Sequence, residues 1–145
     1  MPKNKGKVPS SAISVSGKKV PRIAQEVDGN ILQYWSFKHF DGDGPFGWHL
    51  CQETVLWLLD ILKDRQGINW NHLTQGNKSH NIPVVDLEKN AQQRLVQLQL
   101  DDYEELFSMR ITGKQRIFGI RDRNIFHVLW WDPNHQVCLS HKKNT

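Results

Sequence analysis

Apolar and polar residues follow a period of two near the start and in the last third of the chain, and a helical period in between. Residues 32–40, LQYWSFKHF, alternate as a strand does, and the turn-forming stretch DGDGP at 41–45 ends the alternation. Apolar residues then recur every three or four positions from Phe46 to Arg65, and Gly67 follows as a stop signal. This order predicts a first strand that leads into a long helix.

The middle of the chain carries a second helical pattern. Residues 68–84 predict a connecting loop with one short helical turn in the stretch NWNHLTQ. Asp86 is suited to cap a helix that continues to about Leu98, because leucine or alanine recurs on one face at steps of three or four. We therefore expect two helices before the last third of the chain.

Strand-like alternation returns after residue 104. Three β-rich runs, 105–111, 114–122 and 124–132, are joined by the short turns TGK and DRN, which is typical of an antiparallel meander. The order strand, helix, helix and three strands predicts an α+β fold in which a mostly antiparallel sheet has helices packed on one face. The last run is apolar on both faces, so we expect it to be the central or next-to-central strand.

Composition and cysteine usage limit the class of protein. The 145 residues are 38% hydrophobic and include six tryptophans and six phenylalanines, enough for one domain with a real core. No stretch approaches the roughly 18–20 apolar residues of a membrane span, and the first residues lack the apolar core of a secretory signal. Cys51 and Cys138 match no zinc pattern and predict free thiols in a cytoplasmic protein. We therefore expect no metal, no cofactor and no membrane association.

Charge is distributed unevenly. Residues 1–22 hold six Lys or Arg and no acid, residues 23–105 have a net charge of −7, and residues 106–145 have a net charge of +5. The first stretch mixes Lys, Ser, Gly and Pro, which predicts a basic, mobile arm over residues 1–24 and a single α+β domain over residues 25–145. Clustered positive charge on predicted strands favours a polyanionic partner such as nucleic acid.

The last third of the chain resembles a known family. The stretch LFSMRITGKQRIFGIRDRNIFHVLWWDPNHQV is similar to the end of the RelE/ParE superfamily of small bacterial toxins, with Arg110, RIFG at 116–119, the strand IFHVLWW and the polar segment DPNH in the corresponding places. The predicted order of elements over residues 33–138 resembles that superfamily as well. The first helical region is longer than the helical hairpin of the family, and CLSHKKNT replaces its late cluster of Arg, Lys and Tyr. A second resemblance, to a group of bacterial proteins with SF..FD near the start and LWWDPNH near the end, implies no function.

The resemblance to the ribonuclease branch of this superfamily implies a metal-independent endoribonuclease. In that reaction the 2′-hydroxyl of RNA attacks the adjacent phosphate. The implied partners are RNA or the ribosome, and a small acidic antitoxin. Two alternatives remain open: a non-catalytic module on the same fold that binds nucleic acid or protein, and a ParE-like inhibitor of a topoisomerase.

Such a reaction needs groups that move protons and cations that bind phosphate. Histidine titrates near neutrality, so we predict His135 as the proton-transfer residue and Asp132 as its orienting partner. Arginine presents a planar fork to phosphate, so Arg110 and Arg116 are predicted to form a phosphate clamp. His80, in the polar stretch GNKSHNIP, is a further catalytic candidate. The DPNH stretch is equally typical of a turn in which Asp132 accepts backbone amides.

The remaining predictions concern binding and packing. Three residues extend the basic surface for nucleic acid: Lys114, Arg121 and Arg123. Trp130 and Trp131 point to opposite faces of their strand, so one is expected in the core while Trp130 is the candidate to stack on a base. His127 is expected to share a packed face with Leu129 and Trp131. The sequence contains no Gly-rich phosphate loop and no G-x-S-x-G motif.

Overall fold

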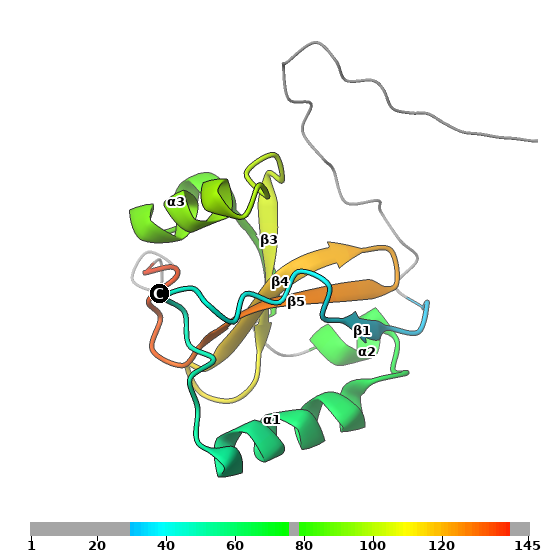
Figure 1. The fold of residues 1–145 in the computed structure, drawn as a ribbon. Helices are drawn as coiled ribbons and strands as arrows, with labels where there is room; N and C mark the ends of the chain where they lie inside the picture. The colour runs from blue at the N-terminus through cyan, green and yellow to red at the C-terminus, as the bar shows by residue number, and fades with distance from the viewer. Residues whose placement is uncertain (1–29, 76–78, 140–145) are drawn as a thin grey trace, which may run out of the picture.

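The computed structural model describes residues 30–75 and 79–139, and Figure 1 shows their arrangement. These residues form one sheet with helices above and below it. In chain order the elements are β1 (Tyr34–Ser36), α1 (Gln52–Arg65), α2 (Trp70–Thr74), β2 (His80–Pro83), the 3-10 helix η1 (Val84–Asp86), α3 (Lys89–Gln97), β3 (Glu105–Arg110), β4 (Arg116–Asp122) and β5 (Ile125–Asp132). The basic arm predicted for residues 1–24 lies outside the described residues.

The five strands form a single sheet in the order β1-β5-β4-β3-β2. The pairs β5–β4, β4–β3 and β3–β2 are antiparallel, whereas β1 joins β5 in parallel. The predicted mixed α+β fold with a mostly antiparallel sheet is therefore confirmed. The position of β5 beside the central strand β4 is confirmed as well, and it agrees with the apolar character of both faces of β5.

Helices cover both faces of the sheet, so the prediction that they pack on one face is wrong. Figure 1 shows α3 on one side of the strands and α1 with α2 on the other. Two separate core clusters account for this. The first joins Ala91 and Leu95 of α3 to strand residues such as Phe118, and the second joins Leu58 and Leu62 of α1 to strand residues such as Ile117. Alternate strand residues face opposite sides, so strands that are apolar on both faces need a helical layer on each.

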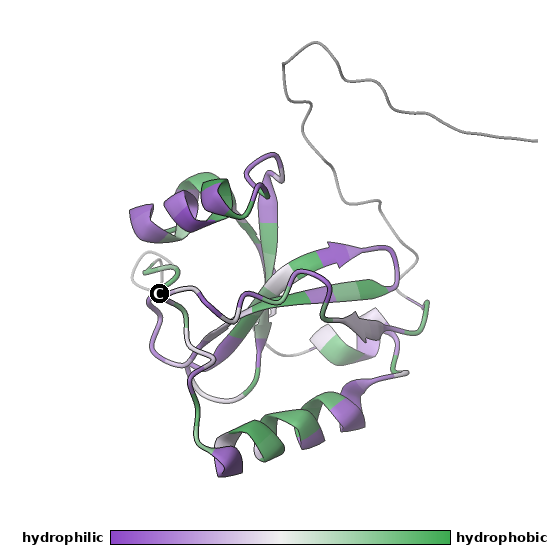
Figure 2. Ribbon diagram, in the orientation of Figure 1, coloured by the Kyte–Doolittle hydropathy of each residue, from purple (hydrophilic) through white to green (hydrophobic). Residues whose placement is uncertain are grey.

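Hydropathy follows this arrangement. Figure 2 shows hydrophobic residues along the middle strands and in the middle turns of α1, while hydrophilic residues cover much of α3. Trp130 and Trp131 lie on opposite faces, as predicted, and both are buried, with 0% and 3% exposure. Each tryptophan therefore stabilises a different core layer.

A β-bulge in β5 changes which residues share a face. Phe118 of β4 lies opposite Trp130, but the next residue, Gly119, lies opposite Val128, so Leu129 is the extra residue. Leu129 consequently joins the core on the α3 side, whereas Trp131 packs on the α1 side. The predicted common face of His127, Leu129 and Trp131 is wrong for this reason. Gly119 permits the bulge, because a Cβ there would lie 2.2 Å from a carbonyl oxygen of β5.

Helix α1 begins at Gln52 and not at Phe46, because residues 46–48 pack against β5 in a non-helical conformation. The ring of Phe46 packs 4.8 Å from that of Trp130, and the Trp48 indole donates to the Leu129 carbonyl oxygen at 2.9 Å. Gly47 has a φ of +76°, and a Cβ at this position would lie 2.6 Å from the Trp131 carbonyl oxygen. At position 47 the chain therefore passes the backbone of β5 too closely for any residue that has a side chain.

The segment between α1 and β3 also differs from the prediction. The short helical turn is confirmed as α2, whose N-cap Asn69 accepts from the backbone N–H of His72 at 2.8 Å. The expected loop contains the edge strand β2, whose weak alternation carried no clear signal. The predicted N-cap Asp86 is wrong, because η1 precedes α3 and the cap position of α3 is Glu88.

A buried ion pair anchors the DGDGP turn to α3. Asp41, 4% exposed, accepts from Arg94 Nε at 2.9 Å and Nη2 at 2.6 Å, and from the Trp130 indole at 2.8 Å. One carboxylate thus joins the first turn, α3 and β5.

Within the described ranges, none of the helices combines the length and the apolar content needed to cross a membrane. Cys51 is exposed at the N-cap of α1, and Cys138 is buried after β5.

Candidate functional site

The fold brings the five predicted catalytic residues to one end of the sheet. In antiparallel strands, the start of one strand lies beside the end of the next. His80 begins β2, Arg110 ends β3, Arg116 begins β4 and Asp132 ends β5, while His135 follows three residues later. The predicted meander already makes β3, β4 and β5 neighbours, whereas the place of β2 beside β3 is seen only in the structure.

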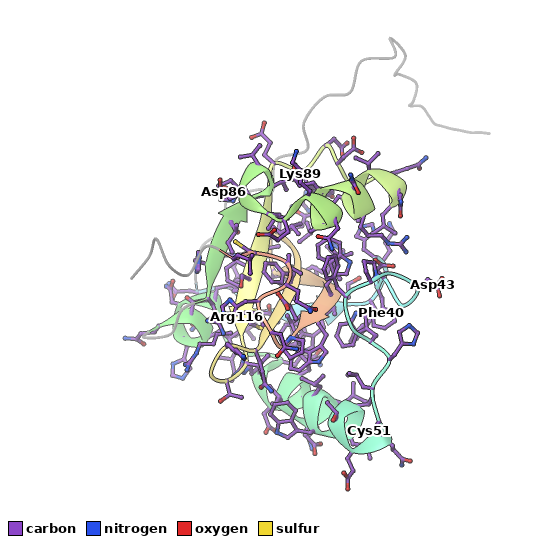
Figure 3. The ribbon with its side chains drawn as sticks, turned by 90° about the vertical axis from the view of Figure 1, so that its left-hand side faces the viewer. Phe40, Asp43, Cys51, Asp86, Lys89 and Arg116 are labelled. Atoms are coloured by element: carbon purple, nitrogen blue, oxygen red, sulfur yellow. The ribbon has the colours of Figure 1, made fainter. Side chains whose placement is uncertain are left out.

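Four of these residues share one face of the sheet. Arg110 lies directly opposite Arg116, and Arg116 lies directly opposite Asp132, so the three side chains form a row across three strands. His80 lies opposite Ser108, two residues before Arg110, and therefore on the same face. In Figure 3, Arg116 is found at this end of the sheet, between α3 above and α1 below.

A third arginine, which the sequence patterns do not single out, joins this end of the sheet from α1. Arg65 is the last residue of α1, and its Nη1 and Nη2 donate to the carbonyl oxygens of Arg110 and Ile111 at 2.8 and 3.3 Å. We call Arg65, Arg110 and Arg116 the arginine cluster. In the sequence Arg65 is an ordinary basic residue in the last turn of a helix, 45 positions before Arg110, so no local signal identifies it.

Backbone carbonyls of the β3–β4 turn hold the other two guanidinium groups. Arg110 Nε donates to the Gly113 carbonyl oxygen at 3.2 Å. Arg116 Nη1 donates to the same oxygen at 2.8 Å and to the Gln115 carbonyl oxygen at 2.9 Å. Each guanidinium has five N–H donors, so these bonds fix the groups in place and leave most donors for another acceptor.

The surroundings of Arg65 and Arg116 disfavour the charged forms of these side chains. Burial, and then the nearby charge of Arg110, lower the pKa of Arg65. The same two causes lower the pKa of Arg116, although the carboxylate of Asp132 opposes them. Arginine remains charged in proteins despite such shifts. The cluster is therefore a set of partly desolvated cations that repel one another, and an anion bound there would relieve that repulsion.

The DPNH stretch is built as a turn around Asp132. This carboxylate is 1% exposed and accepts three backbone N–H groups, those of Asn134 at 3.3 Å, Gln136 at 2.9 Å and Val137 at 2.9 Å. His135 adopts a φ of +57° in this turn and is half-buried. The role that the structure gives Asp132 is to fix the turn that carries His135. Its predicted role as partner of the imidazole stays a prediction.

Three of the predicted nucleic-acid contacts do not extend the basic surface at this end: Trp130 is buried, and Arg121 and Arg123 lie further along β4 and in the turn that follows it. Trp130 is fully buried and its indole donates to Asp41, so the ring has no free face for a base, which corrects the stacking prediction. Arg121 lies with its guanidinium carbon 4.1 Å from the ring centre of Trp70, and burial lowers its pKa. Arg123 is exposed in the β4–β5 turn at the opposite end of the sheet. Lys114, by contrast, is exposed in the β3–β4 turn beside the arginine cluster.

Two further observations complete the description. Among the residues that the structure describes, no group of three or more His, Cys, Asp or Glu side chains is placed to hold a metal ion. Comparisons with protein-family models, with curated proteins and with solved structures find no match to this chain.

Proposed function

We propose that the protein binds RNA through the arginine cluster at the end of the sheet. The observation that carries this proposal is the pairing of Arg110 with Arg116 on one face of the sheet, where the carboxylate of the neighbouring Asp132 is engaged by three backbone amides. Arg65 adds a third positive charge from α1, bonded to the backbone carbonyl of Arg110. Guanidinium groups held by carbonyls, with donors to spare, suit the oxygens of a phosphate.

The positive charge around the arginine cluster favours a ligand with several phosphates over a ligand with one. Lys114 extends the positive charge along the β3–β4 turn, and residues 106–145 have a net charge of +5. Neutralising several phosphates of one strand releases counterions and makes binding depend on salt. The choice of RNA over DNA rests on the resemblance of this part of the chain to the ribonuclease branch of the RelE/ParE superfamily.

Metal-independent RNA cleavage is the second candidate function. It is favoured by the direct pairing of Arg116 with Asp132, because His135 lies only three residues beyond that pair. In this reaction a base takes the proton of the 2′-hydroxyl, the 2′-oxygen bonds to the phosphorus, and the 5′-oxygen leaves with a proton from an acid. His135 and His80 are the candidates for these two roles, and Arg110 with Arg116 would stabilise the charge on the phosphorane.

Salt-dependent binding tests the first proposal. Affinity for a labelled single-stranded RNA is measured by fluorescence anisotropy at several salt concentrations. Arg110→Gln/Lys114→Gln is expected to weaken binding and to reduce the slope of log affinity against log salt by about 0.7 for each phosphate that the protein no longer neutralises.

Arg123→Asn/Lys38→Gln is the matched control, because it removes the same charge from exposed residues, one in the β4–β5 turn and one just after β1, near His127 of β5. Asparagine also tolerates the φ of +57° at position 123. Equal losses of affinity in the two double variants would show that only net charge matters, and the arginine cluster would not be the site. Cleavage is tested separately, by looking for products that end in a 2′,3′-cyclic phosphate and a 5′-hydroxyl.

A further inference from the structure

Two phenylalanines are exposed just after β1. Phe37 is 50% and Phe40 43% exposed, whereas the other four phenylalanines of the chain, all among the described residues, are at most 4% exposed. Single exposed apolar residues are common on protein surfaces, but neighbouring large ones are typical of a binding surface. This pair is therefore a candidate contact for a ligand.

The neighbouring structure fixes both rings. The Phe40 N–H donates to the Phe37 carbonyl oxygen at 3.1 Å, and this turn brings the two ring centres to 6.3 Å from each other. The Phe40 ring also lies 5.0 Å from that of Trp48, whose indole donates to the Leu129 carbonyl oxygen of β5. We call Phe37, Phe40 and Trp48 the aromatic row. Because the row is anchored to β5, little ordering of its rings is needed when a ligand binds.

The aromatic row offers rings and little net charge. The exposed charged residues nearest in sequence, Lys38 and Asp43, are of opposite sign, and each acts on another part of the fold. Burial lowers the pKa of His127, and the charge of Lys38 adds to this effect. The charge of Asp43 helps to raise the pKa of Arg94. The part of a ligand that the row contacts should therefore be flat and uncharged, as a nucleobase is.

The aromatic row lies close to the proposed RNA site. Trp48 is bonded at Leu129, and Asp132, which lies opposite Arg116, follows three residues later on β5, a separation of about 10 Å. In Figure 3, Phe40 and Arg116 both lie in the layer between α3 and α1. Single-strand-binding domains contact about 4–16 nucleotides, so one strand is long enough to reach both places.

We propose that the aromatic row stacks on unpaired bases of the RNA strand whose phosphates contact Arg110 and Arg116, so that the protein selects single-stranded RNA. This inference rests on the proposed RNA-binding function. Phe37 and Phe40 present the rings, and Trp48 holds Phe40 in place. In a duplex the bases are paired and stacked on one another, so their faces are not available to the rings.

The test compares three labelled RNAs by fluorescence anisotropy on the full chain. They are a single-stranded decamer, the same decamer paired with its complement, and a decamer of abasic nucleotides. All three carry phosphates, but only the first offers unpaired bases. The wild-type chain should bind it more tightly than the duplex, and about five- to 150-fold more tightly than the abasic strand, the range expected for one base stacked on an aromatic ring.

Phe37→Leu/Phe40→Leu keeps apolar side chains but removes both rings, so it should lose most of this preference. Its affinity for the abasic strand and its slope of log affinity against log salt should stay unchanged, because no phosphate contact is removed. Phe37→Tyr/Phe40→Tyr keeps the rings and should retain the preference. Leu56→Ala/Leu59→Ala is the matched control, because these leucines of α1 are 51% and 48% exposed, and it should leave binding of all three RNAs unchanged.

Equal affinities of the wild-type chain for the single-stranded decamer and the abasic strand would overturn the inference and leave RNA binding intact. Unchanged binding by the leucine variant of Phe37 and Phe40 would overturn it as well, and would leave a protein partner as the ligand of the exposed rings. Absence of binding to any of the three RNAs would overturn the proposed function, and this inference with it.

Discussion

Asp41 offers the sharpest test of what joins the first turn to α3 and β5. Its carboxylate accepts from the fully buried Trp130 indole and, through two bonds, from Arg94. Asp41→Ala would leave the indole N–H buried without an acceptor, which costs about 1–3 kcal/mol. It would also leave the Arg94 charge unpaired. Breaking a fully buried pair costs about 3–5 kcal/mol, but the Arg94 side chain is 20% exposed, so its share is smaller. We expect a total loss of about 3–4 kcal/mol in the free energy of unfolding.

Urea denaturation followed by circular dichroism measures this loss. Asp41→Asn is the finer probe, because its amide keeps one oxygen acceptor but no charge, and we expect about half the loss. A double-mutant cycle with Arg94→Met separates the ion pair from the indole bond. A loss below about 0.5 kcal/mol for Asp41→Ala, the size usual for surface changes, would refute the reasoning.

The same pair predicts a dependence on pH. Burial alone would raise the pKa of Asp41, but hydrogen bonds from Arg94 and Trp130 outweigh burial and hold that pKa below its usual value. Because the pKa is lower in the folded state, the contribution of this carboxylate is complete above the unfolded pKa of about 3.9 and is lost as the pH falls through the folded pKa. The difference in stability between wild type and Asp41→Asn should therefore shrink below about pH 4.

Three further changes probe the rest of the molecule. Trp131→Ala removes a 3% exposed indole from the α1 side of the core and should cost about 3–5 kcal/mol in urea denaturation, whereas a cost near zero would mean that this layer is loosely packed. Gly47→Ala should lower the melting temperature, because the residue has a φ of +76° and its Cβ would meet the Trp131 carbonyl oxygen at 2.6 Å; an unchanged melting temperature would contradict the close crossing. Asp132→Ala should destabilise the protein by about 2–3 kcal/mol because three backbone N–H groups lose their acceptor, while His135→Asn, which tolerates the φ of +57°, should leave the melting temperature nearly unchanged. If His135 transfers protons, the Asn variant should also lose RNA cleavage by about 10²- to 10⁴-fold and relieve any growth inhibition; wild-type cleavage would remove His135 from the mechanism.

Local patterns predicted the elements of this fold better than their packing. The predicted bounds of the three late strands agree with the structure to within one or two residues, because β-rich runs separated by short turns mark them. The prediction of helices on one face is wrong, and the apolar character of both faces of β5 is the physical reason for a helical layer on each side. The hydrophobic pattern does not reveal the bulge at Leu129, because β5 is apolar on both faces and a shift of the alternation by one residue leaves its pattern unchanged.

The residues of the candidate site were likewise predictable where local patterns fix their position, and unpredictable where long-range packing does. Arg110, Arg116 and Asp132 could be proposed together because short turns connect their strands and fix their pairing. Arg65 could not, since its place beside β3 depends on how α1 crosses the sheet. The sequence predicts Trp130 as a surface residue because its partner Asp41 lies 89 positions away, and no local pattern indicates their hydrogen bond.

The parallel pairing of β1 with β5 has a consequence for biosynthesis. Tyr34 of β1 pairs with Ile125 of β5. Beyond β1, Asp41 accepts a hydrogen bond from the Trp130 indole, and the Trp48 indole donates to the Leu129 carbonyl oxygen. A ribosome that has made residues 30–124 has therefore produced every helix that the structure describes, but it has not yet made β5, with which β1 pairs. Contacts of such long sequence separation form late and slow folding. Until β5 emerges, the nascent chain exposes the apolar faces of both layers, and this interval is when it most needs protection from aggregation.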